Sequence, residues 1–276
     1  MTAAVALTVA GSDPSGGAGV QADLKTFSAL GAYGTAVLTA LTAQNTRGVT
    51  GVHAVPAAFV GDQLRTLLAD VTVHATKLGM LGSAAVVREV AAVLTDRPGG
   101  PVVCDPVMVA TSGDRLIDED AVDAVRTVLL PVTDLLTPNV PEAAALLQVT
   151  PATSVAELAP QALALLALGP RAVLLKGGHL GGDESVDVLV TVDGVRETRR
   201  PRVDTTSTHG TGCTLSSAIA ALAARVRLAE PGAALDWAPL VEGARDYLQV
   251  ALLEGSALGV GSGHGPVHHF AGWWAA

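Results

Sequence analysis

Residues 208–215 read Thr-His-Gly-Thr-Gly-Cys-Thr-Leu and run directly into the apolar segment 216–224. The two glycines allow a tight turn in which successive N–H groups point toward one place. The first amides of the helix that follows have no partner inside the helix, and the positive end of its dipole lies there too. The stretch therefore predicts an anion-binding corner at the start of a helix, and phosphate is the ligand that suits it best.

Cys213 falls where this helix begins. A thiol at a helix N-terminus has its thiolate favoured, so we expect a phosphate-binding turn and a base side by side. The simpler interpretation is a glycine-rich loop followed by a core helix with a buried cysteine, because short glycine motifs are weak signals. The choice between an anion-binding turn and a simple loop before a core helix depends on the motifs in the rest of the chain.

The composition of the 276 residues indicates an α/β protein. Hydrophobic residues make up 49% of the chain and aromatic residues only 3%, which is typical of helices packed closely on a buried sheet. The net charge of −9 argues against a nucleic-acid partner, which would normally require a basic face. The uncharged stretch 28–46 contains Gly, Thr, Gln and Asn, so it fits buried structure better than a membrane span.

Two sequence features predict a cytoplasmic protein. Cys104 and Cys213 are the two cysteines, and they provide no disulfide framework. The first apolar run is not preceded by a basic region, and Asp13 follows it closely, so a signal peptide is not expected.

Apolar strand-like runs alternate with helical patterns along the chain. We expect strands at 3–10, 35–43, 71–77, 102–104, 134–137 and 172–175, and helices at 20–30, 56–69, 83–94, 121–130, 155–168 and 237–252. Asp193-Gly194 joins the alternating runs 186–192 and 195–200 as a tight edge hairpin. The pattern predicts one domain over residues 1–276, with three α/β/α layers, a mostly parallel sheet and right-handed crossovers.

Polar residues follow several of these strands, where open α/β sheets bind their ligands. The loop at 11–19 reads Gly-Ser-Asp-Pro-Ser-Gly-Gly-Ala-Gly without a following Gly-Lys-Ser/Thr, so it suits a substrate wall better than a nucleotide P-loop. Gln44 offers one donor and one acceptor to a heteroaromatic edge. Asp105 suits a metal or phosphate site, and Lys176 stands beside two glycines where a phosphate could reach it. A flexible turn or a helix cap is the simpler alternative for the loop and for Asp105.

Eight stretches of the chain, taken in order, resemble the hydroxymethylpyrimidine/phosphomethylpyrimidine kinases of thiamine biosynthesis, which belong to the ribokinase-like superfamily. They are residues 10–19, 41–49, 77–82, 105–115, 137–142, 175–180, 208–215 and 263–270. The resemblance covers essentially the full length. It implies a ribokinase-like fold and phosphorylation of 4-amino-5-hydroxymethyl-2-methylpyrimidine by ATP with Mg²⁺, followed by phosphorylation of the monophosphate to the diphosphate. It also implies a homodimer, the state of many superfamily members.

The resemblance assigns roles to particular residues. Gln44 would pair with the pyrimidine edge. The wall of that pocket would consist of Gly11, Ala18, Asp23, Met80 and Val107. Mg²⁺ would lie near Asp105 and Glu142. The nucleotide would be served by Lys176, Asn139 and Thr208. The amides from Gly210 through Thr211 and Gly212 to Cys213 would form the anion hole, and Cys213 would stand in for the aspartate base of many superfamily members.

Two other functions remain open on the sequence. A pyridoxal or pyridoxine kinase would share the fold and the anion hole, although the stretch around Gln44 favours an aminopyrimidine. A catalytically silent vitamin-binding protein would keep the pocket without turnover. The combination of an anion hole, a base and two candidate metal carboxylates argues against the silent protein.

Overall fold

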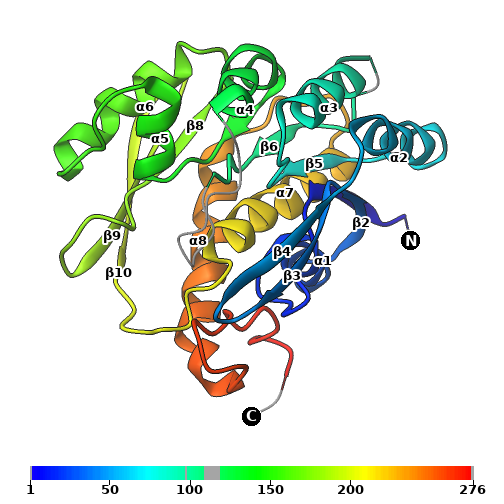
Figure 1. Ribbon diagram of the computed structural model, residues 1–276. Helices are drawn as coiled ribbons and strands as arrows, with labels where there is room; N and C mark the ends of the chain where they lie inside the picture. Colours follow the sequence, from blue (N-terminus) through cyan, green and yellow to red (C-terminus); the bar gives the residue numbers. More distant parts are fainter. Residues whose placement is uncertain (1, 97, 109–118, 275–276) are drawn as a thin grey trace.

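A mostly parallel sheet of eight strands runs through the protein in the computed structural model, which describes residues 2–96, 98–108 and 119–274 (Figure 1). The strand order is β10-β9-β8-β7-β6-β5-β1-β2. Six strands are parallel, and β9 and β10 are antiparallel at one edge. The parallel strands are β1 Ala4–Ala10, β2 Ala32–Leu38, β5 Ala75–Leu78, β6 Val102–Cys104, β7 Leu135–Leu136 and β8 Val173–Lys176.

Helices cover both faces of the sheet and divide the core in two. One face carries α1 Gly19–Ala29, α7 Thr211–Ala229 and α8 Trp237–Leu253, and the other carries α2 Ala57–Asp70, α3 Ala84–Asp96, α4 Glu119–Ala124, α5 Val140–Leu147 and α6 Leu158–Leu166. Leu7 and Val9 of β1 point into the second layer, and Ala4 and Ala6 point into the first, as the two-residue period of a strand requires. The expected three-layer α/β/α fold is confirmed.

The prediction of one continuous strand at 35–43 is wrong, because two strands, β2 and β3, share this stretch. The chain leaves the sheet at Thr39, whose hydroxyl donates to the carbonyl of Met80 at 2.7 Å. The next residues form β3 Ala40–Asn45, which pairs antiparallel with β4 Gly48–Ala54 in a separate two-stranded ribbon (Figure 1). Strand β4 was not predicted from the sequence. Departure from the sheet is what carries Gln44 toward the ligand-binding edge.

Smaller differences occur at element ends. The edge hairpin consists of β9 Glu184–Thr191 and β10 Gly194–Pro201, so its turn residues are Val192 and Asp193, and Gly194 has a φ of +128°. The helix expected at 121–130 is α4 continued by a π-helical turn, Val125–Leu129, and a 3₁₀ turn, Leu130–Val132. The helix expected at 155–168 begins as the 3₁₀ turn Val155–Glu157.

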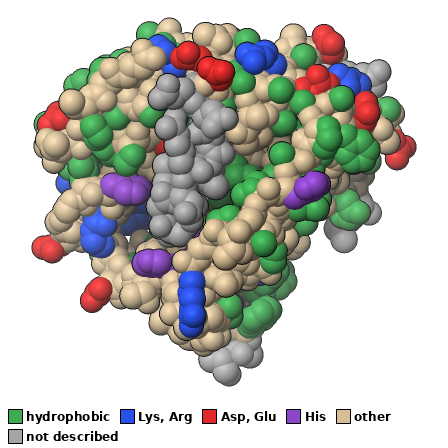
Figure 2. Space-filling view, in the orientation of Figure 1, with side chains coloured by type: hydrophobic (Ala, Val, Ile, Leu, Met, Phe, Trp, Pro, Cys, Tyr) green, Lys and Arg blue, Asp and Glu red, His purple; other side chains and the backbone are tan. Residues whose placement is uncertain are grey.

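Helix α7 is long and apolar enough to cross a membrane by length and composition. It packs against α1, α8 and four strands of the sheet, so its interior position accounts for its apolar character. On the face drawn in Figure 2, acidic and basic side chains are interspersed over the surface with apolar side chains between them.

Phe27 is fully buried in the layer formed by α1, α7 and α8, so Phe27→Ala should leave a cavity there. We expect it to lower the free energy of unfolding by about 3–5 kcal/mol in chemical denaturation. Tyr33 is a matched aromatic control because it is 64% exposed, and Tyr33→Ala should change the free energy by no more than about 0.5 kcal/mol. Equal losses for the two variants would contradict the packing described.

Candidate active site

The carboxyl ends of β1, β5, β6 and β8 border a cavity of about 690 Å³, a volume that suits a small-molecule ligand. Its lining comes from the loops that follow these strands, from β3 and from the start of α7. Every residue assigned to the site from the sequence lines this cavity except Asp23. Residues 109–115 of the motif at 105–115 lie outside the described part of the chain.

The predicted corner lies at the cavity, at the start of α7. The helix begins at Thr211 after Gly210, which has a φ of +80°, and no side chain caps this end within the described chain. Gly210 packs on the loop after β1, because a Cβ there would lie 1.8 Å from the carbonyl oxygen of Gly17. The Thr211 amide makes only a long bond, at 3.4 Å, to the Thr208 carbonyl, so the first amides of α7 can turn to a ligand in the cavity.

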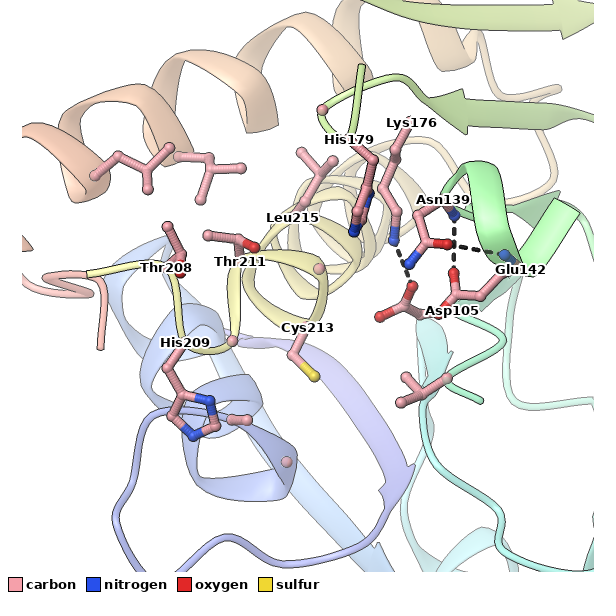
Figure 3. Close-up of a pocket in the computed structure, with 18 of the residues that line it drawn as sticks. Asp105, Asn139, Glu142, Lys176, His179, Thr208, His209, Thr211, Cys213 and Leu215 are labelled. Carbon is pink, nitrogen blue, oxygen red and sulfur yellow. Dashed lines mark hydrogen bonds and ion pairs between the residues drawn. The ribbon is translucent and has the colours of Figure 1, made fainter. Parts of the chain in front are cut away.

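An ion pair faces this corner from the carboxyl ends of β6 and β8. Lys176 Nζ lies 2.7 Å from Asp105 Oδ1, and Figure 3 shows both side chains pointing toward the cavity. A Cβ on Gly212 would lie 3.3 Å from Lys176 Nζ and 3.4 Å from Asp105 Oδ2, so the pair abuts the first turn of α7. Burial alone would lower the pKa of Lys176, but Asp105 and Glu142 outweigh it and raise the pKa. Lys176 thus supplies a fixed positive charge beside the anion corner.

Asn139 and Glu142 form the N-terminal cap of α5. Asn139 Oδ1 accepts a hydrogen bond from the Glu142 amide at 2.9 Å, and the Asn139 amide donates to Glu142 Oε2 at 2.8 Å. This capping box fixes both side chains at the cavity edge (Figure 3). Burial raises the pKa of Glu142 to about 7, with Lys176 opposing the shift and Asp105 adding to it.

Asp105 and Glu142 suit a Mg²⁺ ion that also binds phosphate oxygens. Among the described residues, no group of three or more His, Cys, Asp or Glu side chains could hold a metal ion by itself. In phosphoryl-transfer sites Mg²⁺ is bound by one or two carboxylates together with substrate phosphates and water. Asp105 and Glu142 fit that pattern. The raised pKa of Glu142 means that a nearby cation would favour its ionised form.

Cys213 lines the cavity from the first turn of α7 and is half-buried. Burial raises its pKa to about 11, although Lys77 acts in the opposite direction. The expectation that the helix start favours the thiolate is therefore wrong, because desolvation outweighs the helix dipole and the neighbouring cation. At neutral pH Cys213 carries its proton.

Asp23 corrects a second expectation, since it lies behind the pocket wall. It is fully buried and both of its oxygens lie 2.9 Å from Lys77 Nζ. Thr8 and Ser217 also donate to it, each at 2.6 Å. Asp23 therefore fixes Lys77, a buried lysine of the cavity lining. Its three partners come from distant segments of the chain, so no local pattern could have indicated this role.

An Asp–His pair that was not predicted from the sequence joins the loop at 11–19 to the stretch at 208–215. His209 Nε2 lies 2.7 Å from Asp13 Oδ2, and both residues line the cavity. The amides of Ser15 and Ala18 donate to the same carboxylate. Burial would raise the pKa of Asp13, but the hydrogen bonds from His209, Ser15 and Ala18 lower it. Asp13 and His209 each belong to one of these motifs, but nothing in their separation of 196 residues indicates a contact.

The three-layer α/β/α fold, with the anion corner at the carboxyl edge of its sheet, defines the chain as a ribokinase-like kinase. Residues 13–268 match the phosphomethylpyrimidine kinase family, and the chain belongs to that family. It is 51% identical to the hydroxymethylpyrimidine/phosphomethylpyrimidine kinase of Salmonella typhimurium over 269 residues, which cover 98% of each chain.

Two solved structures show the same fold. An ADP complex of Bacillus subtilis pyridoxal kinase superposes with a TM-score of 0.87 and 32% identity, covering 98% of both chains. The phosphomethylpyrimidine kinase of Clostridium difficile gives a TM-score of 0.75 and 37% identity, covering 88% of this chain and 97% of that one.

Gly212→Val should slow phosphoryl transfer from ATP by about 10²–10³, the loss associated with one preorganised donor. The added side chain would meet Lys176 and Asp105 and crowd the space in front of the first amides of α7. Gly272 is the matched control because no atom lies within 4 Å of a Cβ built there, so Gly272→Val should keep wild-type turnover. A folded Gly212→Val enzyme with normal turnover would contradict the assignment of the anion corner to the active site.

Proposed function

We propose that this protein uses ATP to phosphorylate 4-amino-5-hydroxymethyl-2-methylpyrimidine, and then phosphorylates the monophosphate to the diphosphate, in thiamine biosynthesis. The observation that carries the proposal is one cavity that contains the anion corner at 210–213, the Lys176–Asp105 ion pair and Gln44, in a chain of this family. The direct test is an assay of the protein with the pyrimidine, ATP and Mg²⁺, in which the products are identified by mass. Absence of both phosphorylated products would refute the proposal.

The arrangement suits phosphoryl transfer, which needs positioning and electrostatic stabilisation more than covalent chemistry. The amides of residues 210–213 would stabilise charge that develops on the transferred group. Lys176 would add a compact positive charge to the phosphates, with Asn139 and Thr208 on the nucleotide side. Asp105 and Glu142 would hold Mg²⁺, which when bound neutralises charge on the phosphate oxygens.

The acceptor side of the cavity suits a flat, amino-substituted ring. Gln44 is half-buried on β3, and Thr42 Oγ1 donates to its Oε1 at 3.3 Å. Gly11 allows close packing there, because a Cβ at this position would lie 2.4 Å from Met80 Cε. Gly11 and Met80, together with Ala18 and Val107, would form an apolar wall beside the hydrogen-bonding edge of Gln44.

The two acceptors make different demands on Cys213. The first acceptor is a primary alcohol, which must lose a proton as the new bond forms, so a positioned base helps. The second acceptor is a phosphate monoester whose second pKa is about 6, so it is already largely ionised at neutral pH. We propose that Cys213 serves as the base in the first transfer alone, through the small fraction of thiolate that its raised pKa allows.

A pyridoxal kinase is the second candidate function. The observation in its favour is structural: a Staphylococcus aureus pyridoxal kinase solved with AMP-PCP and pyridoxal superposes with a TM-score of 0.86. The family match and the 51% identity to a pyrimidine kinase favour the first candidate. Turnover of pyridoxal compared with that of the hydroxymethylpyrimidine separates the two. Binding of either vitamin compound without ATP turnover would instead favour a silent vitamin-binding protein.

We also propose a cytoplasmic homodimer in which residues 1–276 form one domain. The two free cysteines suit a reducing compartment. The continuous sheet from β2 to β10, with α7 and α8 packed on it, supports a single domain. Sedimentation of the purified protein tests the dimer.

Gln44→Ala should raise the KM for the pyrimidine about tenfold, since it removes an edge hydrogen bond worth about 1–2 kcal/mol. The KM for ATP should stay near its wild-type value. Asn45 provides the control because its side chain is exposed on the same strand, and Asn45→Ala should leave both constants unchanged. Equal increases in both KM values for Gln44→Ala would mean that Gln44 supports the fold instead.

Cys213→Ala should slow the first transfer by about 10²–10⁴, the usual span for general-base catalysis, and the second transfer far less. Because the pKa of Cys213 is raised to about 11, the thiolate fraction grows as pH rises. The wild-type rate of the first transfer should therefore increase about tenfold per pH unit between pH 7 and 9, and this dependence should vanish in Cys213→Ala.

Cys104 is the matched control, because it is buried in the opposite core layer and does not line the cavity. Cys104→Ala should retain both transfers and their pH dependence. If Cys213→Ala slows both transfers equally, the residue has a steric role and the base assignment is wrong.

A further inference from the structure

A glycine-rich loop borders the nucleotide side of the cavity. Residues 177–183 join β8 to β9 and read Gly-Gly-His-Leu-Gly-Gly-Asp. Gly178 and His179 line the cavity, and Figure 3 shows His179 beside Lys176. Four glycines in seven residues make such a loop expensive to order, since glycine loses more conformational freedom than any other residue. A loop of this composition needs contacts that fix its shape.

Arg202, just beyond β10, provides most of those contacts. Its Nε donates to the carbonyl of Gly182 at 2.9 Å and its Nη1 donates to the carbonyl of Gly178 at 2.9 Å. Its Nη2 donates to the carbonyl of Leu180 and, at 3.3 Å, to that of Glu184. The Arg202 amide also donates to the carbonyl of Asp183 at 2.8 Å. One guanidinium therefore gathers four carbonyls from a span of seven residues.

The base of the loop is fixed separately from the buried side. Asp187 Oδ1 accepts a hydrogen bond from the Gly177 amide at 3.0 Å, and Asp187 Oδ2 lies 2.9 Å from Arg245 Nη1. Asp187 is almost fully buried. The start of the loop is thus anchored whether or not Arg202 is present, whereas the carbonyls of Gly178, Leu180 and Gly182 are bound by the Arg202 side chain.

We propose that Arg202 is a positioning residue for nucleotide binding: it folds the loop at 177–183 so that His179 and the Gly178 backbone meet the nucleotide beside Lys176. The proposal rests on the proposed function insofar as the ligand on this side of the cavity is a nucleotide. A guanidinium has five N–H donors in a rigid fork, and four of them are engaged by loop carbonyls within the described chain. Arg202 also lines the cavity, but with four of its five N–H donors bound to loop carbonyls its main action is on the shape of the loop.

A neutral His179 fits this role. Partial burial lowers its pKa, and the nearby cations Lys176 and Arg202 lower it further. At neutral pH the ring therefore offers one donor and one acceptor to the nucleotide.

The test compares Arg202→Lys and Arg202→Met with the wild-type protein, using ADP as the probe. Lys keeps the charge but loses the fork, so both variants should weaken ADP binding in calorimetry about tenfold, equivalent to about 1.4 kcal/mol. The Leu180 amide, which donates to the Gly177 carbonyl at 2.9 Å inside the loop, should exchange hydrogen faster by about the same factor in both variants. The kcat at saturating ATP and the KM for the pyrimidine should change by less than about threefold, since Arg202 acts on nucleotide binding alone.

Arg199 is the matched control. It lies on β10, three residues before Arg202, and its guanidinium contacts the exposed carboxylates of Glu184 and Glu197. Arg199→Met should retain the wild-type ADP affinity and loop exchange. Circular dichroism checks that each variant is folded, and the Lys variant keeps the test decisive if the Met variant does not fold.

Two results would overturn the proposal. They are wild-type ADP affinity in Arg202→Lys, and weaker ADP affinity without faster loop exchange. ADP binding and hydrogen exchange do not require the acceptor substrate. A protein that binds ADP but transfers no phosphate to the pyrimidine would therefore refute the proposed function while leaving the role of Arg202 still measurable.

Discussion

The close approach of Gly210 to the carbonyl of Gly17 is the constraint on which the site depends. A Cβ at position 210 would lie 1.8 Å from that oxygen, and the residue has a φ of +80°, so only glycine fits. The contact brings the start of α7 against the loop after β1. The His209–Asp13 pair and the bond from the His209 amide to the carbonyl of Gly265 hold the same junction. Three segments, near the start, the end and the last quarter of the chain, meet there and create one wall of the cavity.

Two lysine–aspartate pairs lie near this junction, and their burial separates their roles. Lys77 and Asp23 are both fully buried, and breaking such a pair by removing one partner costs about 3–5 kcal/mol, so the pair behaves as part of the framework. Lys176 keeps 13% of its side chain exposed at the cavity, so its charge can be offered to a ligand. One cation is thus fully buried near the start of α7, and the other reaches the cavity in front of that helix start. The first is the cation that acts against the raised pKa of Cys213.

The sequence alone determined the architecture and the location of the site. Small apolar runs alternating with helical patterns require a buried parallel sheet covered on both faces, and polar residues after those strands must gather at one edge. For this reason Asp105 and Lys176 could be assigned to one cavity, and the structure brings them together with the residues of the corner. The resemblance to a kinase family supplied the identity of their ligands, which periodicity and composition do not contain.

Only the tertiary structure decided how the assigned residues behave. The apolar run at 35–43 continues through Thr39 without a break signal, so the departure of β3 from the sheet depends on the contact of Thr39 with Met80. Asp23 stands on α1 like any helix carboxylate until Lys77, Thr8 and Ser217 surround it. The thiol of Cys213 follows the same logic: its position at a helix start predicts a low pKa, and burial raises it to about 11. The succession of strands and helices along the chain and the positions of the motifs follow from local patterns. Desolvation and charge pairing depend on atoms that are distant in the sequence and meet only in the folded chain.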